Sequence, residues 1–157
     1  MYILFITKAC CYWFLTDCRG EQFAGFNCLN NIQKHKIRTT QEVANLLVKL
    51  CREGKNDQAI DELYADDIVS HEPKGSPMEL TEGKAAVKDK TLGWEESVQE
   101  IHSATCCDPI VAEHHFSLVM DIDATYKEHG RIKMSEIAVY EVKDGKIVAD
   151  EFFYRMG

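Results

Sequence analysis

The sequence predicts an α+β domain in which three helices come first and antiparallel strands follow. Three observations support this prediction. Apolar residues recur every three or four positions between residues 39 and 97, and from residue 114 onwards they recur every second position. The pair Asp144-Gly145 is typical of the tight turn of a β-hairpin. Helices that precede hairpins in this way pack together on one face of a sheet.

The first helix is predicted to begin just after Thr39, because Thr39 and Glu42 have the spacing of a capping box. Its apolar stripe has the spacing i, i+3, i+4 and i+7, and it consists of Val43, Leu46, Leu47 and Leu50. Gly54 is placed to end this helix.

A second, shorter helix is expected from about residue 56. The segment DDIVSHEP is then expected to be extended, and the prolines and glycine within residues 73–77 predict a loop. A third helix is expected over residues 83–97.

Three strands are predicted after the helices. Residues 114–126 alternate between apolar and polar, and residues 131–143 repeat the pattern on the other side of a turn. The inward positions of the second strand are Ile132, Met134, Glu136, Ala138, Tyr140 and Val142. The last strand, 146–155, is apolar on both faces, as a central strand would be.

Length and composition exclude several classes of protein. A chain of 157 residues forms one domain of ordinary size, and 45% hydrophobic with 28% charged residues is the balance of a globular protein. The net charge of −8 gives no overall attraction to nucleic acid or to an anionic membrane, so neither is expected as a partner. No apolar run is long enough to cross a bilayer.

The cysteine and histidine spacings support no metal site. The seven cysteines form no CxxC pair and no Cys/His zinc pattern, so we expect free thiols in a reducing compartment and a cytoplasmic protein. His114 and His115 would point to opposite faces of a strand and could not bind one metal together. No phosphate loop is present, and no cofactor is expected.

Residues 1–38 lie outside the helix and strand pattern. They are apolar and aromatic, but Lys8 interrupts the apolar run and no small-residue cleavage site follows. We predict a poorly ordered extension or a start codon assigned too far upstream, with a cleaved signal peptide as the less favoured alternative. The folded domain is then residues 39–157.

Glu136 is the most informative single residue. It shares a strand face with five apolar side chains, so its carboxyl loses water and its pKa should rise unless a cation or several donors reach it. One hypothesis is a general acid or base in a pocket. The alternative is a structural acid bonded to a buried backbone group or to an arginine such as Arg131 or Arg155.

Glu72 is the second candidate. Pro73 restricts Glu72 to extended geometry, which fixes the direction of its carboxylate, and His71 could be its proton partner. The alternatives are an exposed acid in a polar loop and a surface histidine. Two aromatic residues, Trp94 and Tyr140, could stack on a ligand or belong to the core.

Several of these segments together resemble a known superfamily. Two capped helices, the segment YADDIVSHEP, a third helix, long strands and the ending EIAVYEVKDGKIVADEFFY are similar to nuclear transport factor 2-like proteins. More narrowly, they resemble the SnoaL-like polyketide cyclase branch, to which ketosteroid isomerase is related. The resemblance covers residues 39 to about 155 and excludes residues 1–38.

The resemblance implies a cone, formed by a strongly curved antiparallel sheet wrapped around the helices, with a pocket at the open end. It also implies a homodimer formed through the sheet. Tyr64-Ala65-Asp66-Asp67 leads without a gap to Glu72-Pro73, so Glu72 occupies the general-base position of the isomerases. Their oxyanion tyrosine falls at Leu47, which cannot donate a hydrogen bond, so steroid isomerisation is not expected.

The leading hypothesis is therefore a pocket protein for a small, mainly apolar organic molecule, acting as a cyclase or isomerase by acid/base chemistry. Glu72 would be the base and Glu136 the acid, and the pocket wall would include Trp94, His102, Met134 and Tyr140. The competing hypothesis is a non-catalytic binding or dimerisation module of the same fold.

Overall fold

The computed structural model describes residues 37–155, so most of the predicted extension, residues 1–36, lies outside the described residues. The elements follow in the order α1 (Thr40–Arg52), α2 (Asn56–Leu63), β1 (Tyr64–His71), β2 (Leu80–Glu82), α3 (Lys84–Ser97), β3 (Val98–Cys106), β4 (Ile110–Val111), β5 (His115–Tyr126), β6 (Gly130–Lys143) and β7 (Lys146–Phe153). The predicted order of helices and long strands is confirmed. Three strands were not predicted. Runs of two or three residues, as in β2 and β4, show no periodicity, and the nine residues of β3, VQEIHSATC, do not alternate between apolar and polar.

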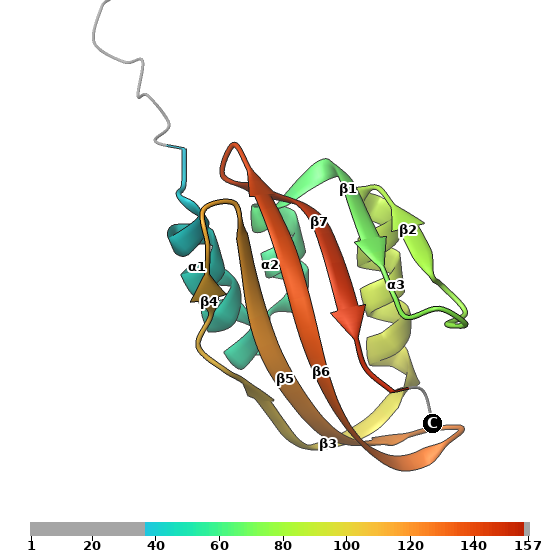
Figure 1. Ribbon diagram of the computed structural model, residues 1–157. Helices are drawn as coiled ribbons and strands as arrows, with labels where there is room; N and C mark the ends of the chain where they lie inside the picture. The colour runs from blue at the N-terminus through green and yellow to red at the C-terminus, as the bar shows by residue number, and fades with distance from the viewer. Residues whose placement is uncertain (1–36, 156–157) are drawn as a thin grey trace, which may run out of the picture. The chain divides into compact units, whose positions relative to one another are not determined.

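The strands form one sheet in the order β2-β1-β7-β6-β5-β3, with β4 paired to β5 (Figure 1). All pairings among the described strands are antiparallel except that of β1 with β7, which is parallel. The prediction of an antiparallel sheet is thus correct except for this one pair. The parallel pair puts the last strand at the centre of the sheet, in agreement with its apolar character on both faces.

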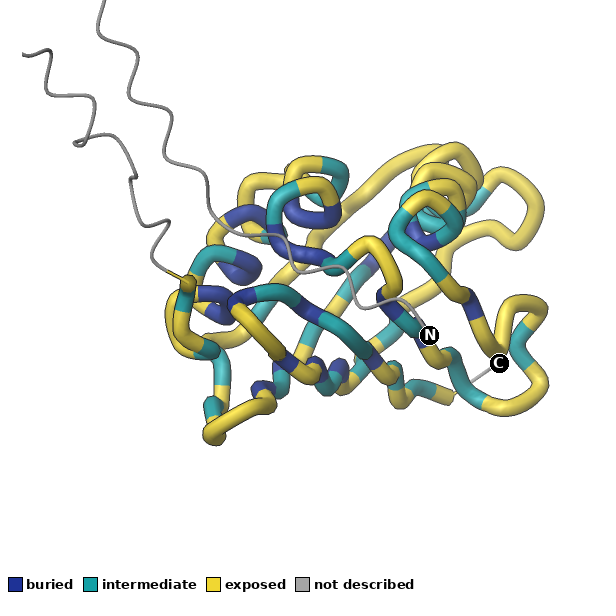
Figure 2. Tube along the Cα trace, turned by 90° about the horizontal axis from the view of Figure 1, so that it is seen from above, coloured by how far each residue is buried: buried dark blue, intermediate teal, exposed yellow. Residues whose placement is uncertain are grey.

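The helices cover one face of the sheet, and the buried residues gather between the two layers (Figure 2). On β5 the even-numbered residues Phe116 and Leu118 face this layer, and on β6 Ala138, Tyr140 and Val142 do so. Odd-numbered residues of both strands face the other way, since side chains alternate along a strand. The helix-facing side of the sheet will be called the inner face and the opposite side the outer face.

Both ends of α1 have the predicted capping. The Thr39 hydroxyl accepts a hydrogen bond from the Glu42 N–H, and the Glu42 carboxylate accepts one from the Thr39 N–H. At the other end Gly54 takes a φ of 66°, and the N–H of Lys55 donates to the carbonyl of Leu50. These local bonds define where the folded domain begins.

The predicted hairpin turn joins β6 to β7. Asp144 and Gly145 both have positive φ, 52° and 77°, as a two-residue hairpin turn requires. The backbone of Arg38 packs directly on Gly145, and a Cβ there would lie 2.8 Å from the Arg38 nitrogen. The turn therefore fastens residues 37–38 to the sheet.

The outer face carries a row of exposed apolar residues. Val119, Ile137 and Phe153 are direct neighbours on β5, β6 and β7, with exposed fractions of 41%, 48% and 49%. This set will be called the outer row. Within residues 37–155 no helix is both long and apolar enough to span a membrane.

Candidate functional site

Glu72 directly follows β1 on the inner face, in line with the buried residues Ile68 and Ser70. Its N–H donates to the carbonyl of Glu79, and Pro73 restricts its backbone to extended geometry. Its side chain is only 15% exposed and is ion-paired. The alternative of a freely exposed loop acid is therefore not what the structure shows.

Lys90 reaches this carboxylate from α3. Its ammonium lies 2.8 Å from Glu72 Oε1 and 2.8 Å from Ser70 Oγ, and its side chain is 16% exposed. The same nitrogen lies 5.2 Å from the ring centroid of Phe152, at cation–π distance. Three contacts thus fix the position of this charge.

Asp150 lies opposite Ser70 in the parallel pair of β7 and β1. It is only 2% exposed, and it is hydrogen-bonded to Ser70 and to Tyr64, while its Oδ1 atom has no partner among the described residues. Burial raises the pKa of Asp150, and the Ser70 hydrogen bond and the Lys90 charge act in the opposite direction.

Glu136 occupies the inner face of β6, next to Met120 on β5. Burial raises the pKa of Glu136 to about 7, the negative charge of Glu72 raises it further, and the Lys90 charge opposes both effects. At neutral pH a large fraction of this carboxyl therefore carries a proton, as predicted from its strand face.

Tyr154 follows β7 and joins the same group. Its hydroxyl is hydrogen-bonded to Glu72 and to Ser76. Burial and the Glu72 charge raise the pKa of Tyr154 to about 12, so it remains a neutral hydrogen-bond donor at physiological pH.

These groups form one site, the carboxyl cluster, which consists of Glu72, Lys90, Glu136 and Asp150. Three carboxyls share a single ammonium, so they cannot all be ionised at low cost. One carboxyl is paired with the cation and another carries a proton in a large fraction of molecules at neutral pH, which is the arrangement that general acid/base catalysis needs.

Three other predicted site residues lie on α3 and β6, the elements that carry Lys90 and Glu136. Met134 is half-buried two residues before Glu136 on the same face of β6. Tyr140 is buried, stacks on Phe116 with ring centroids 4.6 Å apart, and meets Phe152 edge to face at 6.4 Å. Tyr140 is thus first of all a core residue. Trp94 lies one helical turn after Lys90, and its Nε1 donates to the Tyr126 hydroxyl over 3.3 Å.

The two candidate histidines are not brought into the cluster. His71 is exposed and lies between Ser70 and Glu72, so its side chain faces away from theirs. His102 Nε2 lies 2.8 Å from the hydroxyl of Thr125, an odd-numbered residue on the outer face of β5. Among residues 37–155 no group of three or more His, Cys, Asp or Glu side chains is placed to hold a metal ion.

Comparison with known proteins identifies the family. Residues 38–154 match the model of the SnoaL-like domain. The chain is a member of the SnoaL-like family. A Mesorhizobium loti protein of known structure, provisionally named a SnoaL-like polyketide cyclase and a carbohydrate phosphatase, is 36% identical, with a TM-score of 0.71, over 74% of this chain and all of that one.

More distant structures share the fold of this SnoaL-like domain. A Bacillus subtilis protein provisionally named an isomerase is 24% identical, with a TM-score of 0.56, over 73% of this chain and 84% of that one. A nuclear transport factor 2-like protein from Anabaena variabilis is 17% identical, with a TM-score of 0.60, over 80% of this chain and 96% of that one. No protein of curated function matches the chain in sequence.

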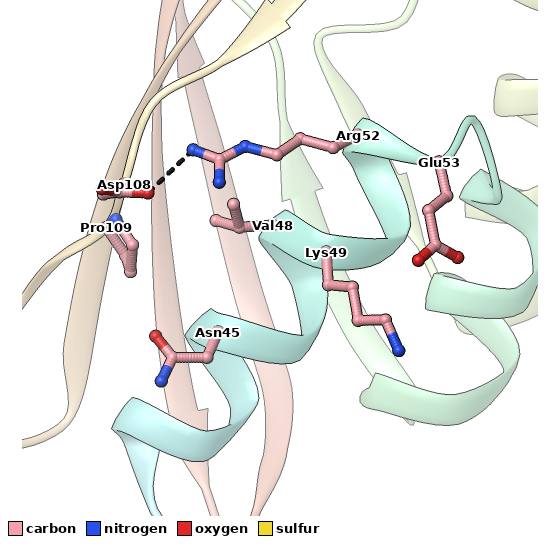
Figure 3. A pocket seen from close by; sticks show the side chains of 7 residues that line it. All are labelled: Asn45, Val48, Lys49, Arg52, Glu53, Asp108 and Pro109. Atoms are coloured by element: carbon pink, nitrogen blue, oxygen red, sulfur yellow. Dashed lines mark hydrogen bonds and ion pairs between the residues drawn. The ribbon is translucent and has the colours of Figure 1, made fainter.

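Two hollows of this SnoaL-like domain are lined by none of the four residues of the carboxyl cluster. The larger, about 440 Å³, lies beside α1 and the segment before β4, where Arg52 bridges to Asp108 (Figure 3). Its other lining residues are Asn45, Val48, Lys49, Glu53 and Pro109. The smaller, about 300 Å³, is lined by residues of β3, β5 and β6 that include Asp123 and Lys133.

Sequence reasoning missed Lys90, Ser70 and Asp150. Lys90 lies three residues after Val87, the one buried residue of α3, but this helix has little amphipathic pattern, so no sequence signal marked Lys90. A signal existed for Asp150. Asp150 is the one carboxylate on the inner face of β7, which is the same signal that identified Glu136.

Proposed function

We propose that this SnoaL-like domain is an acid/base enzyme that moves a proton at a carbon next to a carbonyl group in a small, mainly apolar organic molecule. The observation that carries the proposal is the pair of unlike carboxyls. Glu72 is ion-paired with Lys90, whereas Glu136 is buried with a pKa of about 7. A carboxylate held by a cation and a carboxyl that carries a proton in a large fraction of molecules at neutral pH thus share one site.

The chemistry follows from these two states. The Glu72 carboxylate would take a proton from the carbon beside the carbonyl, and the electron pair of that C–H bond would form the C=C bond of an enol. The carbonyl oxygen would take the proton of Glu136, so that no full negative charge develops on oxygen. In a β,γ-unsaturated ketone, return of the Glu72 proton to the γ-carbon and of the enol O–H proton to Glu136 gives the isomerised ketone. In a dicarbonyl compound, attack of the enol carbon on the second carbonyl, with the enol O–H proton returning to Glu136 and the Glu72 proton passing to the new alkoxide, gives ring closure.

The surroundings favour an apolar ketone over an anionic substrate. Phe152, Tyr140 and Met134 border the cluster, and the three carboxyls outnumber its single cation. A carboxylate or phosphate group would meet repulsion there. A neutral carbonyl compound can instead accept a hydrogen bond from Glu136.

Proton exchange tests the proposal without knowledge of the natural substrate. Neutral ketones and 1,3-diketones would be incubated in D₂O with the protein, and deuterium uptake at the carbon next to the carbonyl followed by NMR. We expect catalysed exchange that is lost in Glu72→Gln and reduced about 10²-fold or more in Glu136→Gln. Glu141→Gln, an exposed glutamate on the same strand as Glu136, is the matched control and should exchange as wild type does.

A second candidate function is a non-catalytic binding module of the same fold. It is favoured by one observation: the two hollows described above are lined by residues outside the carboxyl cluster. Ketones that raise the melting temperature without any exchange would support this module. Exchange rates that are equal in wild type and Glu72→Gln would contradict the enzyme.

A further inference from the structure

Asp150 has no role in the proposed proton transfer. It is almost fully buried in the central strand of the sheet, and one of its oxygens lacks a hydrogen-bond partner among the described residues. A buried carboxyl of this kind destabilises a fold unless its neighbours compensate. Its hydrogen-bond partner Ser70 is also the partner of Lys90.

The chemistry of the groups decides which is the donor and which the acceptor in the hydrogen bonds that link Lys90, Ser70 and Asp150. An ammonium group can only donate, so Ser70 Oγ accepts the bond from Lys90. The single hydroxyl hydrogen of Ser70 is then left to donate to Asp150. Ser70 is 0% exposed, so water does not compete for either bond.

Lys90 is therefore held on one side of the carboxyl cluster. Its two anchors, Ser70 and Glu72, stand two residues apart on the inner face, and Phe152 lies under the ammonium. Glu72 receives a direct charge-assisted hydrogen bond, whereas Glu136 receives only the field of the charge. This asymmetry is what makes the two glutamates different.

We propose that Lys90 is a positioning residue that makes Glu72 the ionised and Glu136 the protonated member of the pair, and that Asp150 holds Lys90 in place through Ser70. The assignment of base and acid rests on the proposed function. The placement of the Lys90 charge does not rest on it, because that placement is a property of the free protein.

The titration of the pair depends on groups from every element around it. Those with an electrostatic effect on Glu136, on Asp150 or on the tyrosines beside them are Tyr64 from β1, Glu72 directly after it, Lys90 from α3, Tyr140 from β6, Tyr154 after β7, Cys51 from α1 and Cys106 from β3. Lys90 is the one cation in this set. Its removal should therefore change the titration more than any other single substitution.

The test is a titration of the glutamate side-chain carboxyls of the free, full-length protein, followed by carbon-13 NMR. In wild type only the Glu136 signal should move through the transition near pH 7. In Lys90→Met the transition should rise by about one pH unit, a tenfold change in proton affinity, and the signals of Glu72 and Glu136 should both move through it. Lys90→Arg keeps the charge and should restore the separate behaviour.

Two further variants test the part assigned to Asp150. Ser70→Ala and Asp150→Asn should each shift the transition in the same direction as Lys90→Met, but less. The double variant should shift it no further than the larger single variant, because both act through one chain of contacts. The matched control is Lys88→Met. Lys88 lies on α3, like Lys90, but its ammonium is at the surface and is paired with Asp61 of α2, so the titration should remain unchanged.

The outcomes separate this inference from the proposed function. A Lys90→Met titration like that of wild type would overturn the role of Lys90, even if Glu72→Gln had lost proton exchange. An unchanged titration in Ser70→Ala would overturn the role of Asp150. The expected shifts without any ketone exchange would support the positioning role while contradicting the enzyme.

Discussion

Arg131 donates two hydrogen bonds to Asp123, one from Nε to Oδ1 over 2.7 Å and one from Nη2 to Oδ2 over 2.8 Å. This bidentate contact holds the pKa of Asp123 well below its usual range. Both residues have odd numbers and lie on the outer face, so Arg131 is engaged on the side of the sheet away from Glu136. The cation that acts on Glu136 is Lys90.

The first prediction concerns Glu136→Gln. A folded-state pKa near 7, above the ordinary 4.5, means that the glutamate's contribution to stability is fully present below about pH 4.5 and is lost as the pH rises through 7. Glutamine does not titrate. We therefore expect the variant to gain stability relative to wild type at pH 8, on the order of 3 kcal/mol at most, and to show little gain at pH 5. Thermal melts at both pH values measure this, and destabilisation confined to pH 8 would contradict it.

The second prediction concerns the hairpin turn. Gly145→Ala should destabilise the domain by about 2 kcal/mol or more, because alanine tolerates a φ of 77° poorly and its Cβ would lie 2.8 Å from the backbone nitrogen of Arg38. Urea titration measures the loss. Gly54→Ala is the matched control: its φ is also positive, but a Cβ there meets no atom within 4 Å. Equal losses in the two variants would show that the contact with Arg38 contributes nothing.

The third prediction concerns the start of the folded domain. A chain that begins at Ile37 should keep its melting temperature within a few degrees, because Arg38 still pairs with Glu62 and Thr39 still caps α1. A chain that begins at Thr40 loses both contacts and should be less stable by about 1–2 kcal/mol. Melting of the full-length protein well above the Ile37 chain would show that residues 1–36 stabilise the domain.

The fourth prediction is a homodimer formed through the outer face. We propose that a second copy of the chain covers the outer row, since three neighbouring strands each expose an apolar side chain there. Sedimentation velocity at micromolar concentration should show a dimer, and Ile137→Asp in the middle of the row should convert it to monomer. Ile110→Asp, on β4 and 77% exposed, is the control and should remain dimeric. A wild-type monomer would refute the proposal.

Local sequence signals predicted the parts of the site that depend on local geometry. Glu136 was found because its strand alternates strictly, and Glu72 because a proline follows it. Lys90 was missed because α3 buries only Val87 fully and shows little amphipathic pattern. Asp150 resembled Glu136 in its sequence pattern, but its role depends on Ser70, which is eighty positions earlier in the chain and adjacent only through the parallel pairing. Contacts of this kind are not encoded in any short window of sequence.

The same parallel pairing has a consequence for how the protein is made. β7 is the last strand of the described domain to be synthesised, and it occupies the centre of the sheet between β1 and β6. Until β7 emerges, β1 and β6 each lack a strand neighbour on one side, and Ser70 and Lys90 lack Asp150. Nascent chains of this protein should therefore expose the unpaired edge of β1 until the last strand of the domain is made, and the edge of β6 only briefly, which favours chaperone binding or aggregation before the sheet closes. Closure of the sheet and assembly of the carboxyl cluster are then a single, late event.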